Sequence, residues 1–253
     1  MSEEFIEKAR MAKPVAVITE GTNMTGASPS SEAEVRRNLD AVVGQTPGLV
    51  LADFAKADVD RLNTFYQVAK KNGRALAVTL RQAYLLDKLA DDLHLKLPNL
   101  RDKDVLIFQK TKKKYYTWEK ETLTLGNVVD ATKAAEMQSK IILVCSFYDF
   151  EELIDIKPNP ESCYILSASE PFDEKMEIDF DRLTNWLVHC GLPQYHIHVS
   201  GHIMPLQLKM ALETVKPKKI FPVHSNYPEL FCRFMRNFEG EILLVEKGKE
   251  YRL

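Results

Sequence analysis

Three residues that could carry acid–base chemistry each stand at the carboxyl end of a segment expected to be a β-strand. They are Glu20, His202 and His224. In open α/β sheets ligands collect beyond the carboxyl ends of strands, where chain reversals and helix N-termini gather. A carboxylate and imidazoles at such an edge suit proton transfer. These residues are therefore the first candidates for a functional site.

A short polar loop precedes the second of these residues and could hold an anion. Ser200, Gly201 and His202 come just before a helix that is expected to begin at Pro205. The free backbone N–H groups at a helix N-terminus can donate hydrogen bonds to an anion, and the helix dipole favours negative charge there. The loop is therefore a candidate phosphate cradle, although strand-loop-helix junctions of this kind are common.

Histidine is scarce, with six in the chain. His196 and His198 occupy alternate positions of an expected strand and so point the same way, as in some zinc sites. The alternative is that one of them packs against its neighbours and bonds to the backbone. A hydrolytic zinc pair needs carboxylates and several more imidazoles than this chain has to spare.

Continuous apolar runs alternate with helical patterns along the chain. Such runs are typical of strands that helices cover on both faces, which predicts an α/β fold with a parallel sheet. Ser31 is expected to cap the helix 32–43, and Pro205 to begin another. A helix is also expected around 127–138, and a hairpin over 241–253. The expected strands cover residues 15–19, 48–54, 74–80, 104–110, 140–146, 162–169, 195–200 and 218–224.

The composition is that of a globular protein able to bury a core. The 253 residues include 34 basic and 36 acidic ones, a net charge of −2, so an anionic substrate would have to meet a local patch. Four cysteines without a CxxC pair suit a reducing compartment. The charged N-terminus and the lack of a long apolar run predict a cytoplasmic protein without membrane spans.

Five segments together resemble the β-CASP branch of the metallo-β-lactamase fold ribonucleases, and most closely the RNase J-like proteins. The match lies in the order of the segments, in their separations and in the 22-residue step from His202 to His224. The segments are TEGTNMTGASPSSEAEV (19–35), LADFAKADVDRLNTFYQVAKKNGRALAV (51–78), SASEPFDE (167–174), HVSGHIMPLQL (198–208) and PKKIFPVHSNYPELF (217–231).

The resemblance implies a role for each strand-end residue. Glu20 matches the acidic motif A, and His202 matches the motif B histidine, both beside the scissile phosphate of RNA in that family. His224 matches the motif C histidine, which implies a zinc ligand. His198, Ser200 and Gly201 would contribute to a phosphate pocket, with Ser167 and Ser169 as neighbours.

The resemblance also implies a domain plan and an incomplete metal site. Residues 32–165 are expected to form the β-CASP domain, a parallel, helix-covered sheet. Residues 1–31 and 166–253 are expected to form a partial metallo-β-lactamase layer. The family's H-x-H-x-D-H zinc signature precedes motif A and is not in this sequence. The chain is therefore expected to lack the N-terminal half that completes the two-zinc site, and to expose apolar surface that favours self-association.

Three functions stay open at this point. The first is part of a zinc-dependent ribonuclease that hydrolyses phosphodiesters. The second is a non-catalytic RNA- or nucleotide-binding module, for which a basic and aromatic segment at 112–118 could grip single-stranded RNA, unless it is a solvated turn. The third is a hydrolase of small phosphorylated substrates.

Overall fold

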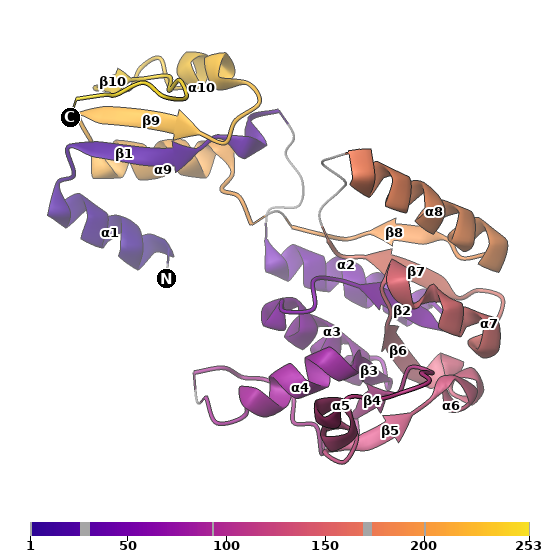
Figure 1. The fold of residues 1–253 in the computed structure, drawn as a ribbon. Coiled ribbons are helices and arrows are strands. Elements are labelled where there is room, and N and C mark those ends of the chain that lie inside the picture. Colours follow the sequence, from indigo (N-terminus) through magenta and orange to yellow (C-terminus); the bar gives the residue numbers. More distant parts are fainter. Residues whose placement is uncertain (1, 26–30, 93, 169–173, 200, 253) are drawn as a thin grey trace. The chain divides into compact units, whose positions relative to one another are not determined.

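The computed structural model describes residues 2–25, 31–92, 94–168, 174–199 and 201–252, and they fall into two compact units (Figure 1). One unit, here the central unit, comprises residues 31–199. The other, here the terminal unit, joins residues 1–30 to residues 200–253.

The central unit is built on a seven-stranded sheet in the order β5-β4-β3-β6-β2-β7-β8, in which every neighbouring pair is parallel. This confirms the expected α/β fold with a parallel sheet. The strands are β2 (Val50–Asp53), β3 (Ala75–Thr79), β4 (Val105–Phe108), β5 (Asn127–Val129), β6 (Ile141–Val144), β7 (Cys163–Leu166) and β8 (Gln194–His196).

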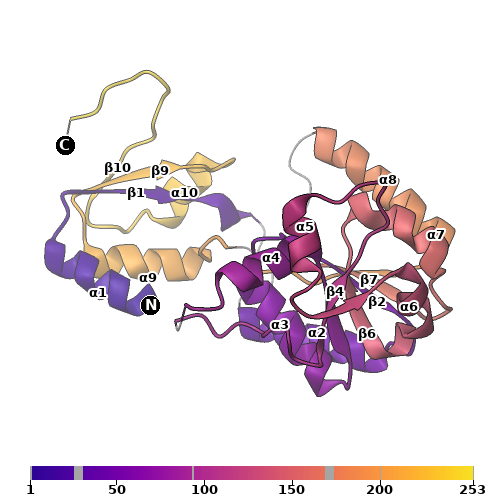
Figure 2. The same ribbon diagram turned by 60° about the horizontal axis from the view of Figure 1, so that its bottom comes forward.

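Helices cover both faces of this sheet (Figures 1 and 2). Alternate residues of a strand point to opposite faces, so Val50 and Ala52 enter one core while Leu49 and Leu51 enter the other. The first core is covered by α2 (Glu32–Gln45), α3 (Val59–Lys71), α4 (Leu80–Lys88) and α5 (Thr117–Thr122). The second is covered by α6 (Ala131–Glu136), α7 (Leu153–Ile156), α8 (Glu174–Cys190) and the 3₁₀ segment η3 (Phe147–Glu152). A further 3₁₀ segment, η2 (Gln138–Lys140), precedes β6.

Local sequence signals account for several helix boundaries. The Ser31 hydroxyl accepts a hydrogen bond from the Glu34 N–H at 3.3 Å, as expected of the N-cap of α2. The helix expected over 127–138 is wrong in its first turn. Asn127–Val129 instead forms β5, whose pairing with β4 supplies the hydrogen bonds that a helix would have made internally.

The terminal unit contains a smaller parallel sheet in the order β1-β9-β10. Its helices α1 and α9 lie side by side (Figure 2). Leu208 of α9 and Phe231 of α10 are buried in one cluster with Ile220 of β9. The elements are α1 (Ser2–Ala12), β1 (Ala16–Glu20), η1 (Thr22–Met24), α9 (Pro205–Val215), β9 (Lys219–Val223), α10 (Pro228–Phe234) and β10 (Glu241–Ile242).

Two sequence-based boundaries need correction. The expected C-terminal hairpin is wrong, because β10 pairs in parallel with β9. The domain boundary expected between residues 165 and 166 falls inside β7, and the central unit continues to Val199 because β8 pairs with β7. None of the helices among the described residues is both long and apolar enough to cross a membrane.

Candidate functional site

The parallel pairing of β1 with β9 brings chain segments about 200 residues apart to one edge of the terminal unit. Glu20, the last residue of β1, lies opposite Val223, the last residue of β9, and His224 follows directly. The loop that enters α9 carries His202 to the same place. The structure therefore brings together the three residues that the strand-end argument selected.

Glu20 is the organising group of this site. Its Oε2 lies 2.9 Å from His202 Nδ1 and accepts the Thr22 N–H at 3.2 Å, while its Oε1 accepts the Ile203 N–H at 2.8 Å. Burial alone would raise the pKa of this carboxyl. The hydrogen bonds from Thr22 and Ile203 and the charge of His202 outweigh burial and hold the pKa below its ordinary value. Glu20 is therefore ionised near neutral pH.

The contact with Glu20 sets the chemistry of the His202 imidazole. A carboxylate acceptor at Nδ1 favours the tautomer that carries its proton there, which gives Nε2 the lone pair that can accept a proton. The side chain is 40% exposed, so a substrate can reach it. The pair is therefore suited to general acid–base work on a bound ligand.

His224 lies beside this pair and has an unusual backbone. Its φ is +50°, in the left-handed region that a residue with a side chain adopts at some cost. The Thr22 hydroxyl donates to the His224 carbonyl at 3.1 Å and lies 3.3 Å from its Nδ1, and the rings of His202 and His224 are 5.4 Å apart. The imidazole is thereby aimed at the pair.

Two residues that the sequence argument did not single out complete this site. The Thr22 backbone and side chain contact both Glu20 and His224, and the Asn23 amide donates to the His202 carbonyl at 2.9 Å. Both residues belong to the polar loop that follows β1. A Gly-Thr-Asn run directly after a strand-end carboxylate was the signal that could have identified them.

The donor set does not fit a complete zinc centre. Among the described residues, no group of three or more histidine, cysteine, aspartate or glutamate side chains is placed to hold a metal ion. Both carboxylate oxygens of Glu20 already accept N–H donors. No chemical step is therefore derived through zinc, and ligation by His224 stays a prediction.

The residues expected to bind phosphate lie in both units. Gly201 is in the terminal unit, where an added Cβ would meet open space, while Ser200 and Ser169 lie outside the described residues. Ser167 is buried in the central unit, where its hydroxyl accepts from Arg61 and donates to the Ile197 carbonyl. The Ser167 hydroxyl is thus engaged within the protein, and its contact with phosphate stays a prediction.

His198 sits close to this buried network at the end of β8. Burial first, and then the charge of Arg61, lowers the pKa of His198, so the ring is neutral near pH 7. Its Nδ1 is buried and has no hydrogen-bond partner among the described residues. The neighbouring His196 bonds to the Ala168 carbonyl at 2.9 Å. These contacts favour the packing interpretation of His196 over a self-contained metal pair.

Arg61 holds together the part of the central unit near Ser167. Its guanidinium is 3% exposed and binds the Glu32 carboxylate with two hydrogen bonds, at 3.0 and 2.9 Å. A bidentate pair of this kind is among the stronger polar contacts in proteins. Arg61 therefore ties α3 to the start of α2 and positions the Ser167 hydroxyl.

Asp53, at the end of β2, has a strongly perturbed carboxyl group. Burial raises its pKa to about 6, although Tyr164 donates a hydrogen bond to it at 2.6 Å. The folded protein therefore binds the Asp53 proton more tightly than the unfolded chain does, in which the pKa of this carboxyl is near 3.8. The contribution of Asp53 to stability is present below about pH 4 and is lost as the pH rises through 6.

Replacing Asp53 by asparagine is expected to stabilise the protein at pH 8 by up to about 3 kcal/mol, and to have little effect at pH 4. The amide oxygen still accepts one of the hydrogen bonds that the Tyr164 hydroxyl and the Phe147 N–H donate to Asp53, and the side chain cannot ionise. Urea unfolding of both proteins at pH 4, 6 and 8 measures the difference. Equal stabilities at pH 8 would contradict a buried, charged Asp53.

Three curated proteins are similar to this chain over most of its length. No family model matches the chain. Ribonuclease J of Thermus thermophilus is 26% identical over 94% of this chain, and Ribonuclease J2 of Bacillus subtilis is 24% identical over 92%. A Ribonuclease J 2 of Streptococcus pyogenes is 23% identical over 85%. The chain is RNase J-like.

The RNase J-like chain matches only a part of these relatives. It spans 40% of the Thermus thermophilus protein, 41% of the Bacillus subtilis protein and 37% of the Streptococcus pyogenes protein. Its fold also resembles the crystal structure of an Enterococcus faecalis protein of unknown function, with a TM-score of 0.67 and 16% identity, covering 97% of this chain and 54% of that one. That likeness supports the fold alone.

Proposed function

We propose that this RNase J-like chain is part of a zinc-dependent ribonuclease and presents Glu20 and His202 to a phosphodiester of RNA. The single observation that carries the proposal is the contact of 2.9 Å between the Glu20 carboxylate and His202 Nδ1. The names of the three relatives supply the substrate class.

The proposed role of the pair is proton transfer. Hydrolysis adds water across a phosphorus–oxygen bond: a new bond forms from the water oxygen to phosphorus, and the bond to the leaving oxygen breaks. His202 Nε2 accepts the proton that the attacking water loses and passes it to the leaving oxygen, while the Glu20 charge stabilises the imidazolium. His198, Ser200 and Gly201 are proposed to hold a phosphate, and His224 to contribute a zinc ligand.

Further packing partners are part of the proposal. Ile18 on the edge strand β1 is 72% exposed, which supports a segment or a second copy of the chain covering this strand. We propose that the covering segment carries the H-x-H-x-D-H signature. A cytoplasmic location is proposed from the sequence alone.

The test is binding and cleavage of a 5′-monophosphorylated single-stranded RNA. The purified chain is assayed with added zinc, alone and together with the part of the Thermus thermophilus relative that this chain does not match. Binding by the chain is expected in both samples, and cleavage is expected only in the complemented one. The proposal would be contradicted if the RNA were neither bound nor cleaved in both samples.

The second candidate function, an RNA-binding module, has less support in the structure. Lys112 is paired with Glu119, and the Tyr115 hydroxyl donates to the Lys110 carbonyl at 2.6 Å, so both are engaged within the protein. Tyr116, 68% exposed, remains accessible for stacking. Tight RNA binding without cleavage in both samples would favour this candidate.

A further inference from the structure

A pocket of about 380 Å³ lies at the carboxyl edge of the central sheet, within the central unit. It is distinct from the residues that the proposed function uses, because it includes neither Glu20 nor His202. Its size is within the range of small-ligand sites. Its lining comes from the loop after β2, from the ends of β3, β4 and β6 with the segments that follow them, and from α5. The lining residues with charged or polar side chains include Lys56, Arg81, Lys110, Lys112, Glu119 and Asp149.

The sheet topology explains why a pocket opens here. β3 and β6 are neighbours in the sheet, but they are not consecutive in the chain. The chain leaves β3 into α4 on one face and leaves β6 into η3 on the other face. Loops that depart toward opposite faces open a crevice between them, and such a switch point is where parallel sheets bind ligands.

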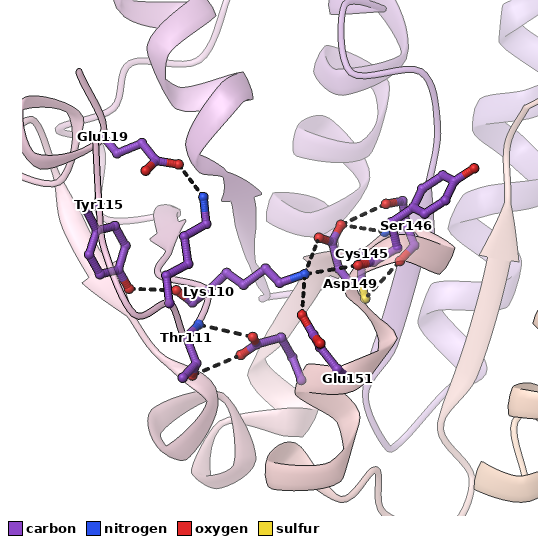
Figure 3. Close-up of polar contacts among 11 residues, drawn as sticks. Lys110, Thr111, Tyr115, Glu119, Cys145, Ser146, Asp149 and Glu151 are labelled. Atoms are coloured by element: carbon purple, nitrogen blue, oxygen red, sulfur yellow. Dashed lines mark hydrogen bonds and ion pairs between the residues drawn. The ribbon is translucent and has the colours of Figure 1, made fainter. Parts of the chain in front are cut away.

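The charge of the pocket is positive. It is lined by four cationic side chains and two carboxylates, which leaves a formal excess of two positive charges. Lys110 is held by Asp149 at 3.2 Å and Glu151 at 2.8 Å (Figure 3). Lys112 is paired with the buried Glu119. These two lysines are therefore largely neutralised by the protein itself.

Lys56 and Arg81 are the cations that remain. Within the described part of the chain, neither forms an ion pair or a side-chain hydrogen bond. Arg81 stands in the first turn of α4, where a cation opposes the helix dipole and no acidic residue of that turn offsets it. The carboxylate within electrostatic range of Arg81 is that of Glu119, which is already paired with Lys112. An anion bound by Lys56 and Arg81 would offset the unfavourable interaction between the Arg81 charge and the α4 dipole.

A second, largely apolar pocket of about 380 Å³ adjoins the first and shares Lys56 and Tyr148 with it. It lies at the ends of β2, β6 and β7, under α8. Phe54, Phe147 and Phe180 contribute aromatic surface, and Asp53 contributes a carboxyl group. Tyr148 stands between the two pockets and is 69% exposed.

We propose that the two adjoining pockets form one nucleotide site, with the phosphate at Lys56 and Arg81 and the base in the apolar pocket. A nucleoside 5′-phosphate joins an anion to a flat apolar ring, which matches a cationic pocket beside an aromatic one. Asp53 is placed to meet a hydroxyl or amino group of the ligand. The nucleotide is either free or the end of an RNA strand.

Calorimetric titration of the chain with AMP, ribose 5-phosphate, inorganic phosphate and a 5′-phosphorylated trinucleotide tests the site. AMP is expected to bind about 10-fold more tightly than ribose 5-phosphate, because the base adds apolar contact. Lys56→Gln and Arg81→Gln are each expected to weaken AMP binding about 10-fold. A trinucleotide that binds more tightly than AMP, with the same loss in both variants, would identify an RNA end as the ligand.

Lys113→Gln is the matched control, because Lys113 is an exposed lysine of the neighbouring segment and does not line the pocket. Its AMP affinity is expected to stay within about 2-fold of the unmodified chain. Circular dichroism checks that every variant is folded. Unchanged AMP affinity in the Lys56 and Arg81 variants, or ribose 5-phosphate binding as tightly as AMP, would overturn the proposal. Both outcomes concern AMP binding alone, so they do not depend on whether Glu20 and His202 take part in RNA cleavage.

Discussion

Replacing Arg74 by methionine is expected to lower the free energy of unfolding by about 4 kcal/mol. Arg74 is 6% exposed and its guanidinium donates to four backbone carbonyls, those of Gly48 at 2.9 Å, Ile141 at 3.1 Å, Gln138 at 3.3 Å and Thr46. Methionine fills a similar volume but donates no hydrogen bond. Several carbonyls at the amino ends of the central strands would then be buried without a partner.

The measurement is urea unfolding at pH 7. Arg74→Lys is expected to lose less stability, since the ammonium group keeps the charge and some of the donors but lacks the planar fork. Arg37→Met, at an exposed position of α2, is the matched control and is expected to change stability by less than about 0.5 kcal/mol. A loss below about 1 kcal/mol for Arg74→Met would show that water replaces the guanidinium.

The central sheet could be predicted from the sequence because its strands are buried on both faces. All four residues of β4, β6 and β7 are buried, so the apolar runs were continuous and their helical partners were periodic. Such strands can be identified from their own residues, without information on the elements that pack against them. The order of the strands, with β6 between β3 and β2, is set by tertiary packing and left no local signal.

The elements that were wrong or absent from the prediction depend on distant partners. Asn127–Val129 is three residues long and is a strand only because β4 offers a free edge. Glu241–Ile242 pairs with β9 rather than with a following strand. In both cases the local sequence has only a weak preference for a strand, and the free edge of a distant strand, β4 or β9, determines the structure that forms.

In the candidate site, too, some features could be predicted from the local sequence and others depend on distant partners. The strand-end rule accounts for the meeting of Glu20 and His224, because β1 and β9 are parallel and end at one edge. His202 reaches them on the loop before α9 and not from a strand end, since β8 ends at His196 and pairs with β7 in the central sheet. The rule could not show which side chains are already engaged. Ser167 looked available in the sequence, and the structure shows its hydroxyl bonded to Arg61 and Ile197. Partners of this kind are fixed by the packing of α3 against the sheet.

Replacing Glu20 by glutamine is expected to reduce RNA cleavage at least about 100-fold in the preparation that cleaves RNA. The glutamine oxygen still accepts the Ile203 N–H, which holds the loop in place. Its amide, however, donates to His202 Nδ1 and so moves the proton of the neutral ring to Nε2. The imidazole then lacks the lone pair on the side that the substrate meets. His202→Ala is expected to lose activity at least as strongly.

Two measurements separate this role from a structural one. The ¹⁵N chemical shifts of the ring nitrogens report the tautomer of His202 and are expected to exchange between the unmodified chain and Glu20→Gln, without any need for turnover. His94→Ala, at an exposed position, is the matched control for cleavage and is expected to leave the rate unchanged. An undiminished rate in His202→Ala, or the same tautomer in both proteins, would be incompatible with proton transfer by this pair. The tautomer tests the contact between Glu20 and His202 Nδ1 on which the proposal rests. The cleavage rate of His202→Ala tests whether that imidazole transfers the proton.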